Sequence, residues 1–246
     1  MTWIYLSPHF DDAAYSCGGL IWSQSREGEA PEVWTVFSGR PGYQPLTPFA
    51  QSLHARWQLP WQAAVEARER EDQEALRCLE VPGRGLGIPE CVYRYLPDGM
   101  PVVQQEADLW QAIPPGEIRL AETLAETLSS QAPPGANLVS PLSLGNHVDH
   151  RIVRAAAEKC LEQGRGVSLW FYADYPYAMR GYPPQAEEEM EEVTFPISEP
   201  ALAAWQQAAA AYASQFSSFW QTDEQMRAEL KEFRDKMGGI TLYRHP

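Results

Sequence analysis

Two short segments, far apart in the chain, carry histidine and aspartate side chains that could bind a metal ion. The first reads Pro-His-Phe-Asp-Asp over residues 8–12, and the second reads His-Val-Asp-His over residues 147–150. Three of the five histidines fall in these two segments. Imidazole and carboxylate groups are the usual ligands of a catalytic zinc ion, which takes three protein ligands and leaves one position for water or substrate. The sequence therefore predicts a zinc site that the two segments share.

The spacing within each segment indicates how the ligands are divided. His9 and Asp12 are three residues apart, so a tight turn brings both to one side while Asp11 points elsewhere. His147 and His150 repeat this spacing. One ligand pair and one further histidine would fill three positions, which leaves one carboxylate and one imidazole for proton transfer.

Each segment also has a simpler explanation when it is taken alone. Asp11 or Asp12 could cap the helix that follows, which is worth about 1 kcal/mol. His147 and His150 could be surface histidines at the start of a helix. A helix cap does not need partner histidines more than a hundred residues away, so the two segments together favour the metal site.

The elements around these segments predict how they are positioned. A short apolar strand at residues 3–6 precedes the first segment, a strand at 137–141 and a loop precede the second, and a helical pattern follows each. Strands and helices alternate along the chain, which predicts an α/β fold with a mostly parallel sheet and ligands at the carboxyl ends of its strands. The other expected strands are 33–37, 92–96 and 167–172, and the other expected helices are 61–79, 118–131, 201–214 and 224–236.

The remaining stretches indicate a single domain. Residues 38–60 are rich in loop-forming residues, and the acidic run at 187–192 is typical of a solvated loop or helix face. We find neither an internal repeat nor a linker. We therefore expect one domain over residues 1–246, with a C-terminal helical segment from about residue 201.

The net charge and the cysteines indicate the compartment in which the protein is expected and the partners that it can bind. The 246 residues include 19 Lys and Arg against 33 Asp and Glu, a formal net charge of −14, which repels nucleic acid and anionic headgroups. We see neither a secretory signal nor an apolar run of about 20 residues. We therefore expect a cytoplasmic protein that binds no nucleic acid and inserts into no membrane, with a homo-oligomer left open. The four cysteines lack CxxC spacing and are expected to be free thiols.

The two motifs, in this order, resemble those of the PIG-L/LmbE-like zinc-dependent deacetylases, whose signatures are a PHxDD turn and a downstream HxxH segment. Three further stretches also resemble family patterns, so that the resemblance covers residues 3 to about 215. These stretches are Arg68-x-x-Glu71, Leu96-Pro97-Asp98-Gly99-Met100 and Tyr172-Ala173-Asp174-Tyr175. The resemblance implies a Rossmann-like three-layer α/β/α domain that removes acetyl groups from N-acetylglucosamine-type substrates.

Carried over residue by residue, the resemblance implies zinc on His9, Asp12 and His150, with Asp11 as the general base. The chemistry supports this assignment independently. Zinc lowers the pKa of its water from 15.7 to about 7, and a neighbouring carboxylate can take the proton as the water attacks a polarised amide carbonyl.

Four more residues receive roles, two from the chemistry and two from the resemblance. His147 is expected to stabilise the oxyanion or to protonate the leaving amine, and Asp149 to fix a histidine tautomer, with a helix cap as its alternative. Arg68 and Asp98 match family positions that contact the sugar. The alternatives are an exposed helix charge for Arg68, paired with an acidic residue of the same helix, and a turn residue for Asp98.

The sequence departs from the family pattern at two positions. Phe10 stands where many members have proline, and Ala13 stands where they have glutamate. These departures leave the candidate ligands intact. The sequence thus predicts a zinc-dependent hydrolase that removes the acetyl group from an N-acetylglucosamine-type amino sugar conjugate. The alternatives are a zinc amide hydrolase with a non-sugar N-acyl substrate and a non-catalytic carbohydrate-binding protein with the same fold.

Overall fold

The strands form one mixed sheet that is parallel at its centre. The computed structural model describes residues 1–42, 45–57, 60–164, 166–179 and 190–245. The strand order in this part of the chain is β3-β2-β1-β4-β5-β7-β6. Strands β1 to β5 pair in parallel, whereas β6 and β7 join at one edge in antiparallel fashion. The strands are β1 (Thr2–Ser7), β2 (Ala30–Thr35), β3 (Gly83–Gly85), β4 (Asn137–Pro141), β5 (Ser168–Tyr172), β6 (Glu191–Phe195) and β7 (Ile240–Arg244).

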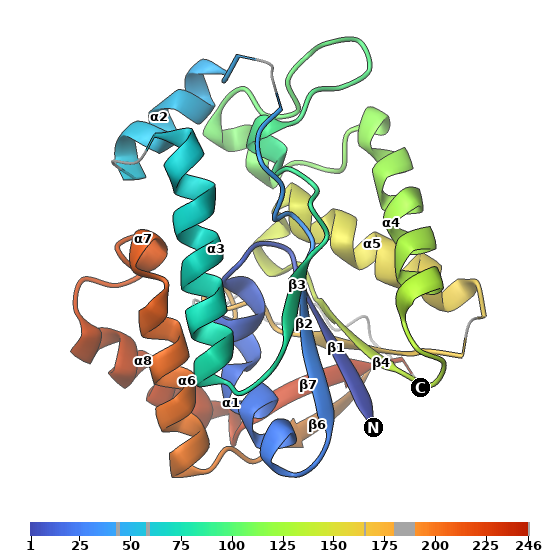
Figure 1. Ribbon diagram of the computed structural model, residues 1–246. Coiled ribbons are helices and arrows are strands. Elements are labelled where there is room, and N and C mark those ends of the chain that lie inside the picture. The colour runs from blue at the N-terminus through green and yellow to red at the C-terminus, as the bar shows by residue number, and fades with distance from the viewer. Residues whose placement is uncertain (43–44, 58–59, 165, 180–189, 246) are drawn as a thin grey trace.

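Helices cover both faces of this sheet (Figure 1). One face is covered by α1, α3, α6 and α8, and the other by α4 and α5. This arrangement confirms the predicted three-layer α/β/α fold with a mostly parallel sheet. The helices of the layers are α1 (Asp12–Arg26), α3 (Trp61–Cys78), α4 (Ile118–Gln131), α5 (Val148–Glu162), α6 (Glu199–Ala211) and α8 (Asp223–Met237); the short helices α2 (Pro48–Trp57) and α7 (Ala213–Phe216) lie outside them.

Strand β1 lies at the centre of the sheet because its residues are apolar on both sides. Trp3 and Tyr5 pack into the core beneath α1 and α6, and Ile4 and Leu6 pack into the core beneath α4 and α5. Each such burial contributes roughly 1.5–3 kcal/mol. The carboxyl end of β1 is therefore held inside the molecule, where the turn that follows it can meet other elements.

The contact between α1 and α6 depends on a glycine. A Cβ atom at Gly18 would lie 2.4 Å from Cδ1 of Trp205, whose side chain is fully buried and donates a hydrogen bond to the carbonyl of Tyr15. At Gly19, a Cβ atom would lie 2.9 Å from a methyl group of Ile197 and 3.2 Å from Cε3 of Trp205. The indole cannot move far without losing its hydrogen bond, so the closer approach at Gly18 is the more costly of the two.

We expect Gly18→Ala to lower the free energy of unfolding by about 1–3 kcal/mol more than Gly19→Ala, because its Cβ atom would approach the fixed indole much more closely. Both variants gain the same helix propensity, so their difference reflects how closely each Cβ atom approaches its neighbours. Thermal and urea denaturation measure this difference. Equal stability of the two variants would show that α6 can move away from α1 at no cost.

Two stretches near the site differ from the prediction. Residues 48–57 form α2 instead of a loop, with Pro48 at its start and the Thr47 hydroxyl accepting a hydrogen bond from the backbone N–H of Ala50. Residues 92–96, predicted as a strand, contain the end of a 3₁₀-helix (Cys91–Tyr93) and a single bridge from Tyr95. A short apolar run is compatible with any buried segment, so its composition did not decide between the two.

The C-terminal part also differs in detail. The predicted helical segment is present as α6 and α8, but the chain then returns to the sheet as β7. Glu191 and Glu192 are exposed, as predicted, although they begin strand β6 and not a loop or a helix. Residues 187–189 of the acidic run lie outside the described residues.

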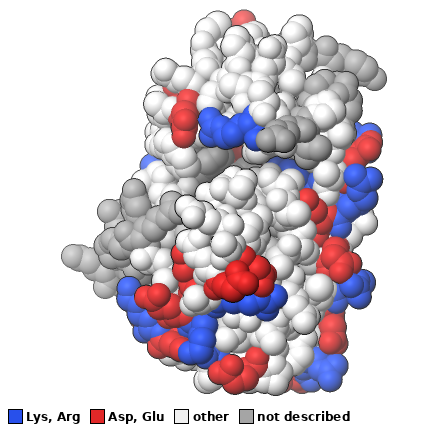
Figure 2. All heavy atoms as spheres, turned by 90° about the vertical axis from the view of Figure 1, so that its left-hand side faces the viewer, with Lys and Arg blue, Asp and Glu red and all other residues white. Residues whose placement is uncertain are grey.

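The described surface carries charges of both signs, and the cysteines are free thiols. On the face shown in Figure 2, the Lys and Arg side chains lie among Asp and Glu side chains. None of the described helices is long and apolar enough to cross a membrane. The cysteines are free, as predicted: Cys17, Cys91 and Cys160 are buried and Cys78 is half-buried.

Candidate active site

The two predicted segments meet at the carboxyl ends of neighbouring strands. Residues 8–11 connect β1 to α1, and the loop after β4 leads into α5. Because β1 and β4 pair in parallel, these connections lie side by side. Asp12 Oδ2 lies 3.1 Å from His9 Nδ1 and 3.3 Å from His150 Nε2. The structure therefore brings together the three residues that the sequence predicted as metal ligands.

The turn that carries His9 and Asp12 is fixed by its own hydrogen bonds. The backbone N–H of His9 donates to Asp12 Oδ2 over 2.7 Å. The hydroxyl of Ser7 donates to the carbonyl of His9 and accepts the backbone N–H of Ala13. Both candidate ligands of this turn are consequently held at fixed positions.

The outer nitrogen of each candidate histidine ligand is held by a buried carboxylate. His9 Nε2 lies 3.0 Å from Asp149 Oδ2, and His150 Nδ1 lies 2.6 Å from Asp174 Oδ1. A carboxylate accepts hydrogen bonds, so it fixes the tautomer that leaves the other nitrogen available to a metal. Asp149 thus has the predicted contact with a histidine. Asp174 belongs to a family-like stretch of the sequence, but nothing in that stretch revealed its partner.

The electrostatics keep the Asp12 carboxylate charged. Burial alone raises the pKa of Asp12, but His150 and His9 beside it outweigh this effect and hold the pKa well below its usual range. A charged carboxylate between two imidazoles is the state that binds a cation most strongly.

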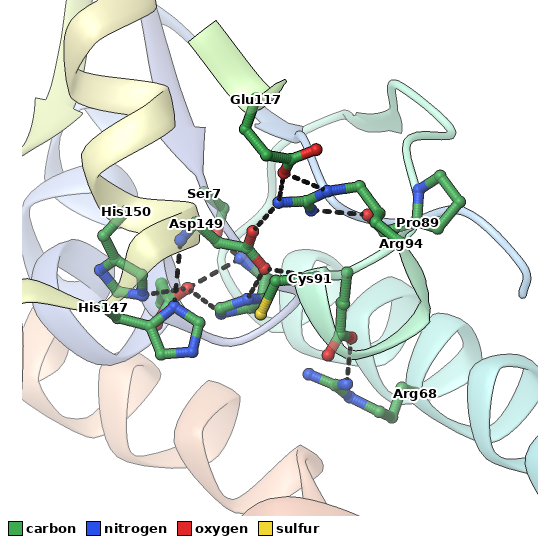
Figure 3. Close-up of polar contacts among 12 residues, drawn as sticks. Ser7, Arg68, Pro89, Cys91, Arg94, Glu117, His147, Asp149 and His150 are labelled. Atoms are coloured by element: carbon green, nitrogen blue, oxygen red, sulfur yellow. Dashed lines mark hydrogen bonds and ion pairs between the residues drawn. The ribbon is translucent and has the colours of Figure 1, made fainter. Parts of the chain in front are cut away.

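Asp149 is itself held by a buried network (Figure 3). Its side chain is completely buried and accepts the backbone N–H of Cys91 over 3.0 Å. The guanidinium of Arg94 lies between Asp149 and Glu117, 2.8 Å from Asp149 Oδ1 and 2.7 Å from Glu117 Oε2. Sequence reasoning missed Arg94 and Glu117, because neither belongs to a motif and only the fold brings them to the site.

His147 stands at the start of α5 with one ring nitrogen already used. Its Nδ1 accepts the backbone N–H of Asp149 over 3.2 Å, which places the ring proton of the neutral form on Nε2. Burial and the neighbouring His9 lower the pKa of His147 to about 3. A neutral imidazole with a proton on Nε2 can donate a hydrogen bond near neutral pH. His150, which follows in the same helix, is buried, so the alternative that it is a surface histidine is wrong.

Asp11 is buried beside the candidate ligands. It occupies the N-cap position of α1, yet its side chain forms no capping hydrogen bond, so the cap alternative is wrong for this residue. Burial and the neighbouring Asp12 raise the pKa of Asp11 to about 6, against the opposing charges of Arg68 and His9. A carboxyl with this pKa can take up a proton near neutral pH.

The two predicted sugar-binding residues have different surroundings. Arg68 is 6% exposed and pairs with Glu90, so it is not the exposed helix charge of the alternative reading. Its guanidinium lies 5.7 Å from the ring centroid of Phe10. Asp98 lies on an exposed turn, where Oδ1 accepts the backbone N–H of Met100. This contact supports the turn reading of Asp98, and its role toward a sugar stays a prediction.

The two departures from the family pattern are both buried. Phe10 packs into the core on the α3 side and beneath the guanidinium of Arg68. Ala13 is completely buried in the same core. An apolar contact thus occupies the position where many family members carry a carboxylate.

Comparison with known proteins places this chain in a family. Residues 4–161 match the family model PIG-L, described as GlcNAc-PI de-N-acetylase. The chain is 30% identical over 191 residues to a 2'-N-acetylparomamine deacetylase of Niallia circulans, covering 72% of this chain and 67% of that protein. It is 32% identical over 182 residues to a protein of the same name from Streptomyces fradiae, covering 71% of this chain and 57% of that protein.

A solved structure shows the same fold. The zinc-inhibited form of teicoplanin deacetylase superposes with a TM-score of 0.84 at 24% identity, covering 99% of this chain and 97% of that chain. The resemblance predicted from the motifs is confirmed, and so is the prediction of a deacetylase at the level of the family. The chain belongs to the PIG-L family of de-N-acetylases.

Proposed function

We propose that the protein is a zinc-dependent hydrolase that removes the acetyl group from an N-acetylated amino sugar conjugate. One observation carries the proposal: His9, Asp12 and His150 converge on one point while buried carboxylates hold the outer nitrogens of both histidines. Carboxylate-oriented histidine ligands are the usual surroundings of a catalytic zinc ion.

The donor atoms fit a zinc ion. Zinc–ligand bonds of about 2.0–2.2 Å at tetrahedral angles place ligand atoms roughly 3.3–3.6 Å apart. The distances from Asp12 Oδ2 to the two histidine nitrogens, 3.1 and 3.3 Å, are close to that separation. A second group, His9, His147 and Asp149, also has donor atoms close together. Asp149 there already serves Cys91 and Arg94, so the first group fits better.

The residues around the ligands provide the proton chemistry. A zinc ion supplies a Lewis acid that polarises a carbonyl and makes water easier to deprotonate. Asp11, buried and not engaged in capping, is the proposed acceptor of the proton of the attacking water. His147 donates a hydrogen bond from Nε2 to the oxyanion, because its Nδ1 is occupied, and Asp11 then passes the proton that it has taken to the leaving amine.

The proposed substrate is a cationic amino sugar conjugate. Both curated relatives carry the name of an enzyme that deacetylates an N-acetylated paromamine. The net charge of −14 attracts a cationic substrate and repels an anionic one. Arg68 and Asp98 are proposed to hydrogen-bond its hydroxyl groups, as the motifs predict.

Metal analysis and an acetate assay test this function together. We expect about one zinc per chain, and acetate release from N-acetylglucosamine and N-acetylated aminoglycosides that is lost with a chelator and restored by added zinc. Release only from acyclic N-acyl amines would favour the non-sugar hydrolase. Sugar binding without acetate release would favour the carbohydrate-binding protein. A protein without metal and without turnover would refute the proposal.

A further inference from the structure

An exposed tryptophan lies directly against His147. The side chain of Trp110 is 40% exposed, and its ring centroid lies 5.3 Å from that of His147 in an edge-to-face arrangement. The ring of Tyr177 also meets Trp110 edge-to-face, with ring centroids 6.1 Å apart. The His147 ring in turn lies 5.0 Å from that of His9. An apolar surface therefore continues directly from the polar cluster.

The turn that presents Trp110 is held in place by its own hydrogen bonds. Trp110 is the last residue of a 3₁₀-helix (Glu106–Trp110). Asp108 Oδ2 accepts the backbone N–H groups of Gln104 and Gln105, and Oδ1 accepts the side-chain amides of Gln105 and Gln111. Since these contacts fix the turn, the indole is presented beside the site without a loss of order on binding.

The ring of Tyr177 packs against the loop that leads to His147. A Cβ atom at Gly145 would lie 2.5 Å from Cε1 of Tyr177, and the backbone of Gly145 has a φ of +77°. Only glycine meets both demands, a positive φ and the close approach of a ring. This contact holds the tyrosine ring next to the tryptophan.

We propose that Trp110 and Tyr177 form an aromatic platform for the sugar ring that carries the acetamide, and that this platform makes the enzyme prefer cyclic amino sugars over acyclic amides. The inference rests on the proposed function and names a binding surface for its substrate. A pyranose ring has an apolar C–H face and a polar rim, which match an indole beside a cluster of polar groups. An acyclic N-acyl amine covers far less of the indole.

Steady-state kinetics of Trp110→Ala test the platform. We expect the KM for N-acetylglucosamine to rise about tenfold, kcat to fall less than about threefold, and the zinc content to stay at the wild-type value, because the change removes binding surface and no ligand. Trp110→Phe should recover most of the affinity. Leu161→Ala is the matched control: Leu161 is 38% exposed, lies near the other end of α5, and should leave KM and kcat unchanged.

Calorimetric binding of glucosamine separates this inference from the proposed function. If the wild type hydrolyses N-acetylglucosamine but Trp110→Ala has the wild-type KM, the platform is refuted and the function stands. If the wild type binds glucosamine without hydrolysing the acetylated sugar, the proposed function fails, and a loss of binding in Trp110→Ala upholds the platform. A wild type that neither binds nor hydrolyses these sugars refutes both. Preference for cyclic over acyclic acetamides should also fall about tenfold in Trp110→Ala.

Discussion

Replacement of Asp11 by asparagine is expected to reduce acetate release by about 10²- to 10⁴-fold, the usual contribution of a general base. The amide has nearly the same size as the carboxyl but cannot accept the proton of the attacking water. Because Asp11 forms no capping hydrogen bond, the change removes no support from α1. Single-turnover acetate release and metal content, measured on the same preparation, check this expectation.

Asp12→Asn is the matched comparison, because it makes the same chemical change one residue along the chain. Asp12 lies within 3.3 Å of both histidine nitrogens, so this variant should lose metal together with activity. Asp11→Asn should lose activity alone. If Asp11→Asn turned over at the wild-type rate with full metal, the base would have to be another residue.

Arg94→Met is expected to lower the free energy of unfolding by about 3–5 kcal/mol, since it removes the charge that two buried carboxylates share. Asp149 and Glu117 would both lose this partner inside the protein. Asp149 would also hold His9 less firmly, so metal affinity should fall by about 10- to 100-fold. Urea denaturation of the metal-free protein measures the first effect, and competition with a chelator measures the second.

An exposed arginine provides the control for Arg94. Arg227 pairs with Asp223 one helical turn away, and both side chains are more than two-fifths exposed. Arg227→Met should change stability by less than about 1 kcal/mol and leave metal affinity unchanged. Arg94→Lys keeps the charge but not the fork that spans two carboxylates, so its effect should lie between those of the two methionine variants. Equal behaviour of Arg94→Met and Arg227→Met would contradict the network.

The candidate ligands could be predicted from the sequence because they lie in two histidine-containing pairs of short spacing. His9 and Asp12 lie within four consecutive residues, and so do His147 and His150. His9 and Asp12 share one turn, and the apolar strands before the two segments indicated that both reach the same end of a parallel sheet.

The partners of the ligands could not be predicted in this way. Arg94 follows the 3₁₀-helix Cys91–Tyr93 and Glu117 ends the 3₁₀-helix Pro115–Glu117, so only folding brings them together and excludes water around them. Nothing in their local sequence distinguishes a buried arginine from a solvated one.

The elements that were missed have two different explanations. Helix α2 carried a signal that could have been used, because a threonine followed by a proline is a common start of a helix, and Thr47 caps α2 in this way. The segment 91–93 carried no such signal, because a short apolar run takes its form from the neighbours that it meets, and these come from distant parts of the chain. Strand β7 (Ile-Thr-Leu-Tyr-Arg) follows two glycines and is rich in β-branched and aromatic residues, so it also carried a signal that could have been used.

The contact between His9 and Asp149 joins positions that are 140 residues apart in the chain. The pairing of β1 with β4 brings these positions together, so the entropy of closing that long loop is overcome by the sheet and not by the polar side chains. Assembly of the candidate site is thereby tied to completion of the central strands. A nascent or partly unfolded chain would hold the same residues scattered, and hydrolytic activity would arise only with the finished protein.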